Sequence, residues 1–356
     1  MNARIAALLV ALLVLVGGGA LLYQQQSQSQ KPAGAATLGK PLLKGLQAAQ
    51  IASISIREPK DGITLERKDT GWVIAERAGF PADLDKVRDF VVKAIDLKIG
   101  QAEPIGAADR ARLKVDDAAT RVEFRGADGK AIARLLVGKK YFKSEPDNAD
   151  RAIGDGRFVL LPGEEKTVYL VSDPLAQASA KSAEWIARGG FAAEKVKALE
   201  VALANGEGWK IERAADNADW TLAGAKADEK LESTKANAAA YALANVDLAD
   251  VAAKDARPEQ TGLAKPAVVT ASTFDGLVYT LKVGALEGDN YFASVEVTGE
   301  PKPEGNDAEQ RAKRFAERLP RERALAGHTL RIAKSKLEDT LKPRADLLAR
   351  KEDAKK

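Results

Sequence analysis

The stretch GITLERKDTGWVI, residues 62–74, sets the fold class because it has the pattern of two short strands joined by a tight turn. Apolar and polar residues alternate on both sides of Asp69-Thr70-Gly71, which supplies the turn. A variant of the stretch, GWKIERAADNADWTL, returns at residues 208–222. The sequence therefore predicts an antiparallel hairpin that occurs twice in the chain.

Further matched segments follow these hairpins in the same order in both halves. They are Asp96-Leu97 with Asp247-Leu248, Asp128-Gly129 with Asp275-Gly276, Val137-Gly138 with Val283-Gly284, Tyr141-Phe142 with Tyr291-Phe292, residues 167–170 with 329–332, and Trp185-Ile186 with Leu347-Leu348. Their common order indicates an internal duplication. We expect a first repeat at residues 41–187 and a second at 188–350.

Each repeat combines hairpin strands with helices. After Pro81, apolar residues at Leu84, Val87, Val91 and Ile95 have the 3/4 spacing of a helix face, and a further helix should end near Ile186. The second repeat carries a polar helical insertion near 303–325. We predict an α+β fold of two tandem homologous lobes, each an antiparallel sheet with helices packed on one face, because the strands come in hairpins rather than βαβ units.

The N-terminal segment is apolar from Ile5 to Tyr23. These 19 residues carry no charge and would span about 28 Å as a helix, close to the roughly 30 Å of a bilayer core. Arg4 precedes them, so we expect residues 1–4 in the cytoplasm, 5–23 as a single transmembrane anchor, and the rest outside the cytoplasm. A cleaved signal peptide is the alternative. Residues 24–40 are expected to form a flexible tether, and 351–356 a charged tail.

Composition describes the remainder as a globular chain. Hydrophobic residues make up 45%, charged residues 30% and aromatic residues 5%. The absence of cysteine excludes disulfides, thiolate zinc sites and iron–sulfur clusters, and the single histidine excludes any site that needs two imidazoles. Residues 301–356 hold 16 Lys and Arg against 10 Asp and Glu, so the net charge of +4 belongs to the C-terminal part.

Few residues suggest chemistry. No phosphate-binding loop of the form GxxxxGK[ST] occurs, so an associated ATPase would be another chain. His328 is read as the lead-in to a strand, and the acidic loop 144–150 with Asp155 as a solvated turn rather than a calcium site. Three tryptophans, Trp72, Trp209 and Trp220, are expected in the core, with a sugar or peptide platform as the alternative. We therefore predict no catalytic, cofactor-binding or metal-ligating residue and no cofactor.

The segment from Glu309 to Lys356 mixes charges of both signs. A solvated helical surface is the main interpretation, and contact with anionic lipid headgroups or an acidic partner is the alternative. Nucleic-acid binding is not expected, because Phe315 is the single aromatic residue of the segment.

The chain resembles the domain-of-unknown-function family 4340. The resemblance rests on the N-terminal apolar helix, Glu66-Arg67 followed by residues 71–74, Pro81-Ala82-Asp83, residues 137–142, and the strand at 168–171. Relatives in that family include auxiliary components of ABC-type transporters of the gliding-motility kind. The resemblance implies a membrane-tethered extracytoplasmic protein that works beside an ABC permease and ATPase on other chains.

Three functional hypotheses follow. The first is a non-enzymatic accessory or scaffold protein of the cell inner membrane, single-pass, with its bulk in the periplasm or otherwise outside the cytoplasm. The second is a solute- or glycan-binding module with a cleft between the two lobes. The third, ranked last, is a hydrolase that uses carboxylates alone, for which no pair of acidic residues stands out.

Overall fold

The structure is a computed structural model that describes residues 37–144, 146–149 and 151–349. By their contacts these residues form two compact units: the first takes residues up to Gly62 and Arg88–Ala180, the second Ile63–Val87 and the residues from Lys181 onward. The predicted cytoplasmic end, the transmembrane anchor at 5–23, most of the tether and the tail at 351–356 lie outside the described residues. The helices of the described residues include no candidate membrane span.

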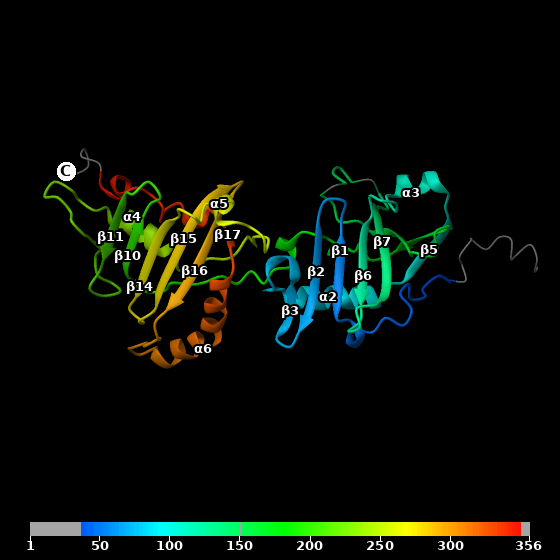
Figure 1. Cartoon of the computed structure of the whole chain (residues 1–356), viewed down its shortest axis with the longest axis horizontal. Coiled ribbons are helices and arrows are strands. Elements are labelled where there is room, and N and C mark those ends of the chain that lie inside the picture. The colour runs from blue at the N-terminus through cyan, green and yellow to red at the C-terminus, as the bar shows by residue number, and fades with distance from the viewer. Residues whose placement is uncertain (1–36, 145, 150, 350–356) are drawn as a thin grey trace, which may run out of the picture. The chain divides into compact units, whose positions relative to one another are not determined.

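The first sheet has nine strands among the described residues, in the order β4-β3-β2-β1-β6-β7-β8-β9-β5. Figure 1 labels β1, β2, β3, β5, β6 and β7 of this sheet. The strands are β1 (Ser53–Arg57), β2 (Gly62–Lys68), β3 (Gly71–Ile74), β4 (Phe80–Pro81), β5 (Ile99–Pro104), β6 (Thr120–Arg125), β7 (Ala131–Tyr141), β8 (Gly156–Leu160) and β9 (Thr167–Val171). The predicted hairpin is present as β2 and β3, with Arg67 opposite Trp72. β1 pairs antiparallel with β6, which brings together strands from distant parts of the sequence.

The second sheet has eight described strands, in the order β12-β11-β10-β14-β15-β16-β17-β13. They are β10 (Val196–Ala202), β11 (Gly208–Glu212), β12 (Thr221–Leu222), β13 (Asp250–Val251), β14 (Ala267–Thr273), β15 (Val278–Glu287), β16 (Asn290–Thr298) and β17 (Leu330–Ala333). The long β15 and β16 pair antiparallel from Val278 opposite Thr298 to Glu287 opposite Asn290. Two antiparallel sheets with a few helices confirm the predicted α+β class.

The helices are short except for two. They are α2 (Leu84–Ile95), α3 (Ala107–Leu113), α4 (Ser233–Tyr241), α5 (Pro258–Thr261), α6 (Ala308–Ala324) and α7 (Lys334–Leu337), with 3-10 turns η2 (Ala48–Gln50), η3 (Ala75–Arg77), η4 (Ser182–Glu184), η5 (Leu325–Gly327) and η6 (Arg344–Leu347). The expected helical insertion near 303–325 is α6.

Each long helix buries one face. In α2 the ring of Phe90 stacks on Phe124 of β6, with 6.0 Å between ring centres. In α6 the buried apolar residues are Phe315 and Leu319, and the helix contacts β16. Alternating residues of the strands supply the rest of each core. In β14, for example, buried and half-buried residues alternate from Ala267 to Thr273.

Three local expectations were wrong. The buried stripe of α2 is Val87, Phe90, Val91 and Ala94, whereas Leu84 is 49% exposed because it begins the helix. The helix expected to end near Ile186 is the single 3-10 turn η4. The match of Tyr141 with Tyr291 joins β7 to β16, which do not hold corresponding places in the two sheets.

Candidate functional site

His328 lies between η5 and β17 in a half-buried position. Its Nδ1 atom is buried and has no hydrogen-bond partner among the described residues. Burial lowers the pKa of His328 from 6.5, so the imidazole is neutral at neutral pH. A general base normally has a hydrogen-bond partner that orients its ring, and no described residue bonds to Nδ1 of His328. The ring of Phe80 packs edge-on against the imidazole, with 5.0 Å between ring centres.

The acidic loop uses its oxygens for local structure. Asp155 accepts a hydrogen bond from the backbone amide of Lys143 at 2.8 Å, and the Asn148 side chain accepts one from the amide of Arg151 at 3.2 Å. Residues 145 and 150 of this loop lie outside the described residues. In the part of the chain that is described, no three His, Cys, Asp or Glu side chains gather in a way that could hold a metal ion.

The three flagged tryptophans are buried, as predicted. Trp72, Trp209 and Trp220 are 8%, 4% and 7% exposed. The guanidinium of Arg213 lies 4.6 Å from the ring centre of Trp220, within cation–π range. The indole of Trp209 donates a hydrogen bond to the carbonyl oxygen of Lys342 at 2.8 Å. These rings fill the interior, so they offer no exposed platform for a sugar.

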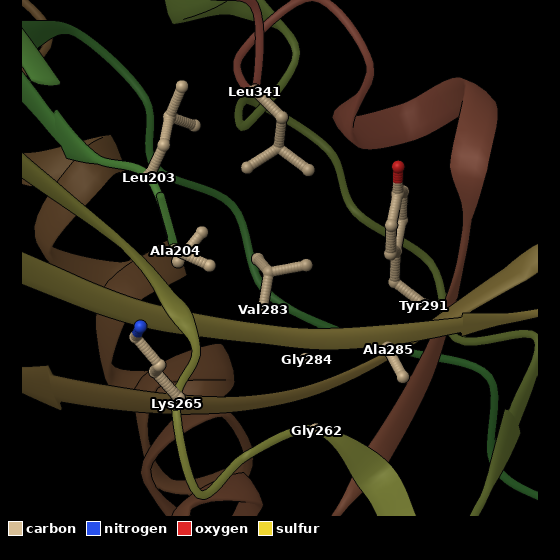
Figure 2. A pocket seen from close by; sticks show the side chains of 10 residues that line it. Leu203, Ala204, Gly262, Lys265, Val283, Gly284, Ala285, Tyr291 and Leu341 are labelled. Carbon is tan, nitrogen blue, oxygen red and sulfur yellow. The ribbon is translucent and has the colours of Figure 1, made fainter. Parts of the chain in front are cut away.

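The candidate site is a pocket of about 390 Å³ inside the second unit (Figure 2). Four segments build it: the end of β10, the turn after α5, the neighbouring strands β14 to β16, and the loop after α7. Its lining residues are mainly aliphatic: Leu203, Ala204, Gly262, Lys265, Ala267, Val283, Gly284, Ala285, Tyr291 and Leu341. The volume falls within the range of about 300–1,000 Å³ that is usual for ligand pockets.

Two glycines set the floor of the pocket. A Cβ built on Gly284 would lie 2.2 Å from the carbonyl oxygen of Thr261, and one on Gly262 would lie 2.4 Å from the amide nitrogen of Ala285. Gly262 also ends α5 with a φ of +73°, a conformation that favours glycine. The end of α5 can therefore approach β15 directly only because both positions lack a side chain.

Two polar groups stand at the rim. Lys265 is exposed and Tyr291 is half-buried. Neither the ammonium of Lys265 nor the hydroxyl of Tyr291 has an ion-pair or hydrogen-bond partner in the described part of the chain. The site therefore combines apolar walls with two free hydrogen-bond donors, an arrangement suited to binding.

A buried ion pair fixes α6 close to the turn after β14. Arg311 and Asp275 are each 3% exposed in their side chains, with 3.1 Å between Arg311 Nη1 and the nearer Asp275 oxygen. Arg311 also donates a hydrogen bond to the carbonyl oxygen of Glu304 at 2.5 Å. Burial raises the pKa of Asp275, and the charges of Arg311 and Lys195 oppose that shift.

A second buried charged cluster lies further along α6, at Arg318 and Glu322. The hydroxyl of Tyr279 donates to Glu322 at 2.9 Å, and the amide of Ala192 donates to the same carboxylate at 3.0 Å. Arg318 places Nε 3.4 Å from Glu322 and Nη1 3.0 Å from Glu194. Burial raises the pKa of Glu322, while Arg318 and these hydrogen bonds favour its charged form. Charged contacts as well as apolar ones thus hold α6 on the sheet.

The sequence analysis identified neither the pocket nor the buried charged contacts of α6. The pocket joins residues from distant segments, and the paired strands bring them together. One available signal was the 3/4 spacing of Arg311, Phe315, Arg318, Leu319 and Glu322, which puts charged residues on the buried face of a helix.

Comparison with known proteins gives one match. No curated protein and no solved structure matches the chain. The family described as "Domain of unknown function (DUF4340)" matches residues 72–266, from the second residue of β3 to the residue before β14. The matched stretch covers more than half of the 356 residues and includes helices α2 to α5 and the hairpin of β11 and β12. Helix α6 and the pocket residues from Ala267 onward lie outside it. The chain belongs to this family of unknown function.

Proposed function

We propose that this protein is a non-enzymatic accessory or scaffold protein of the cell inner membrane, associated with an ABC-type transport system. The uncharged segment 5–23 would anchor it, with Arg4 on the cytoplasmic side and the two sheets outside the cytoplasm. The resemblance of the motifs to transporter auxiliary proteins supports the association with a permease and an ATPase on other chains.

The same proposal includes an origin by duplication. With β4 set aside, the strands of the two sheets follow one another in the same order: β3-β2-β1-β6-β7-β8-β9-β5 and β12-β11-β10-β14-β15-β16-β17-β13. A helix precedes the edge strand in each, α2 before β5 and α4 before β13. Independent sheets would rarely share so many connections.

Equivalent close contacts support the duplication at the level of single residues. A Cβ on Gly138 of β7 would lie 2.5 Å from the carbonyl oxygen of Leu113, the last residue of α3. Gly284 of β15 stands in the same relation to Thr261, the last residue of α5. The pairs Arg67 with Trp72 and Arg213 with Trp220 also recur, with 5.4 Å and 4.6 Å between guanidinium and ring centre.

The observation that carries the proposal is this repeated sheet framework. The residues that the halves share, which are glycines at close contacts and arginines over tryptophans, serve packing. A framework of this kind is suited to holding a fixed surface for partner proteins.

Mild-detergent purification tests the proposal. The full chain is tagged at its C-terminus, crosslinked in cells and extracted from membranes, and a matched chain carries a cleavable signal peptide in place of residues 1–30. We expect an ABC permease and ATPase to co-purify with the anchored chain at several times the level seen with the released one. Recovery of neither above background would refute the association.

A reporter fusion tests the location separately. Alkaline phosphatase joined after Lys356 should be active, because it folds in an oxidising compartment, and a cytoplasmic fluorescent reporter at the same position should be dark. The opposite pattern would place the bulk of the chain in the cytoplasm and exclude the proposed orientation.

A solute-binding module is the second candidate function, and the pocket of the second unit is the observation that favours it. Its walls include Leu203, Val283 and Leu341, which suit an apolar solute better than a glycan. A thermal-shift screen of apolar acids, sugars and peptides would test it, and a screen in which no compound raises the midpoint would count against it.

A further inference from the structure

The pocket of the second unit has apolar walls between two polar groups. In Figure 2 the side chains of Leu341 and Val283 point toward each other, with Leu203 and Lys265 on the left and Tyr291 on the right. Val283 is 3% exposed and forms part of the strand interior. Apolar walls on several sides of a hollow favour an aliphatic group, because its burial removes apolar surface from water.

The polar rim carries positive charge without a partner. Lys265 has a free ammonium among the described residues, and the Tyr291 hydroxyl can donate a hydrogen bond. No carboxylate lines the pocket. A single ammonium at one side of the pocket suits one singly charged oxygen acid, because Lys265 is the one charged side chain of the lining among the described residues.

We propose that this pocket binds an aliphatic carboxylate of medium chain length, with the chain between Leu203, Val283 and Leu341 and the carboxylate at Lys265. Tyr291 contributes its ring to the wall on the side of the pocket away from Lys265. The proposal concerns the pocket alone, so it holds whether or not the chain assembles with a transporter.

Protection of Lys265 from acylation tests the proposal without a presumed activity. The full chain in lipid nanodiscs is treated briefly with an amine-reactive ester, and mass spectrometry measures the rate at Lys265 and at Lys302. Lys302 is the internal control because it is exposed and lies outside the pocket lining. We expect saturating octanoate to slow acylation of Lys265 at least fivefold and to leave Lys302 unchanged.

Four further measurements separate the two parts of the ligand. Compared with octanoate, butyrate and acetate should need higher concentrations for half-protection, by about twofold for each methylene lost. This factor is smaller than that of a fully buried methylene, because the pocket is open and buries each methylene only in part. Octyltrimethylammonium should not protect. Leu203→Ser should raise the octanoate concentration for half-protection at least threefold, whereas Tyr291→Phe should leave it unchanged, because the hydroxyl lies away from Lys265. Thermal unfolding of both variants would establish that they fold.

Each alternative result overturns the proposal. Equal acylation rates at Lys265 with and without octanoate would exclude binding. Equal protection by acetate would leave no role for the apolar walls. Equal protection by octyltrimethylammonium would leave no role for the ammonium of Lys265.

Discussion

Replacement of Arg311 by methionine should weaken the attachment of α6 to the second sheet. Methionine keeps an apolar stem of similar length but removes the charge that lies 3.1 Å from Asp275. Asp275 would then be a carboxylate, 3% exposed, with Lys195 as the remaining positive charge that acts on it. Loss of one partner from a buried ion pair costs about 3–5 kcal/mol, and the residual attraction of Lys195 favours the lower end of that range.

Hydrogen exchange followed by mass spectrometry measures this effect in the full chain. A loss of about 3 kcal/mol in the opening free energy of α6 corresponds to roughly 150-fold faster exchange of its amides. Lys313→Met is the matched control, because it removes a charge from an exposed position of the same helix. Exchange in Arg311→Met within about twofold of the Lys313→Met rate would refute the reasoning.

A double variant and a pH series separate the ion pair from simple packing. Addition of Asp275→Asn to Arg311→Met should recover part of the lost protection, since the buried charge is removed along with its partner. The penalty of Arg311→Met should also shrink as the pH falls through the raised pKa of Asp275, because a protonated carboxyl needs no counter-charge. A double variant that is as unstable as the sum of the two single variants would show no coupling and contradict the ion-pair account.

Three further outcomes are expected. Gly284→Ala and Gly138→Ala should each lower the unfolding midpoint in thermal unfolding, by the equivalent of about 1–3 kcal/mol, because the added Cβ meets a helix carbonyl at 2.2 and 2.5 Å; an unchanged midpoint would contradict the close contact. His328, as the single histidine, should titrate below pH 6.5 in an NMR pH series, and a pKa at or above 6.5 would contradict its burial. The free energy of unfolding should fall as the pH drops from 6.5 through that lowered pKa, because the unfolded chain binds the proton more readily than the folded chain. Arg213→Met should lower the free energy of unfolding by about 2 kcal/mol or more, because Arg213 is 5% exposed and its Nε donates to the carbonyl oxygen of Val196. Arg67→Met should lower it by less than about 1 kcal/mol, because Arg67 is exposed. Denaturant unfolding measures both values, and equal losses would contradict this difference.

Much of the fold was predictable because it rests on local signals. Alternation in GITLERK and the turn residues after it placed β2 and β3, and the same signals placed β6 with β7 and β14 with β15. The insertion near 303–325 was expected as a polar helical segment, and the structure has α6 there. Short edge strands such as β4 and β13, with two residues each, were missed because two residues carry no periodicity.

The candidate site was not predictable from the same signals. Leu203, Lys265, Tyr291 and Leu341 have no shared motif. The antiparallel pairing that runs from β10 through β14, β15 and β16 to β17 brings their segments together. The ion pair of Arg311 with Asp275 was equally hidden, because an aspartate before a glycine has the pattern of an ordinary turn. Sequence patterns report local periodicity, whereas a pocket depends on contacts between distant segments.

The helix α6 distinguishes the second sheet from the first. Strand order, with β4 set aside, and the glycine contact at the end of α3 or α5 are common to both sheets, as the proposed duplication predicts. The helix α6 lies between β16 and β17, and no helix among the described residues occupies the equivalent place between β8 and β9. Two buried charged groups fix α6, at a cost in desolvation that simple apolar packing would avoid. Charged anchors define one position of a helix more strictly than apolar contacts do, so we expect the exposed face of α6, rather than the shared sheet, to distinguish the second half in its interactions.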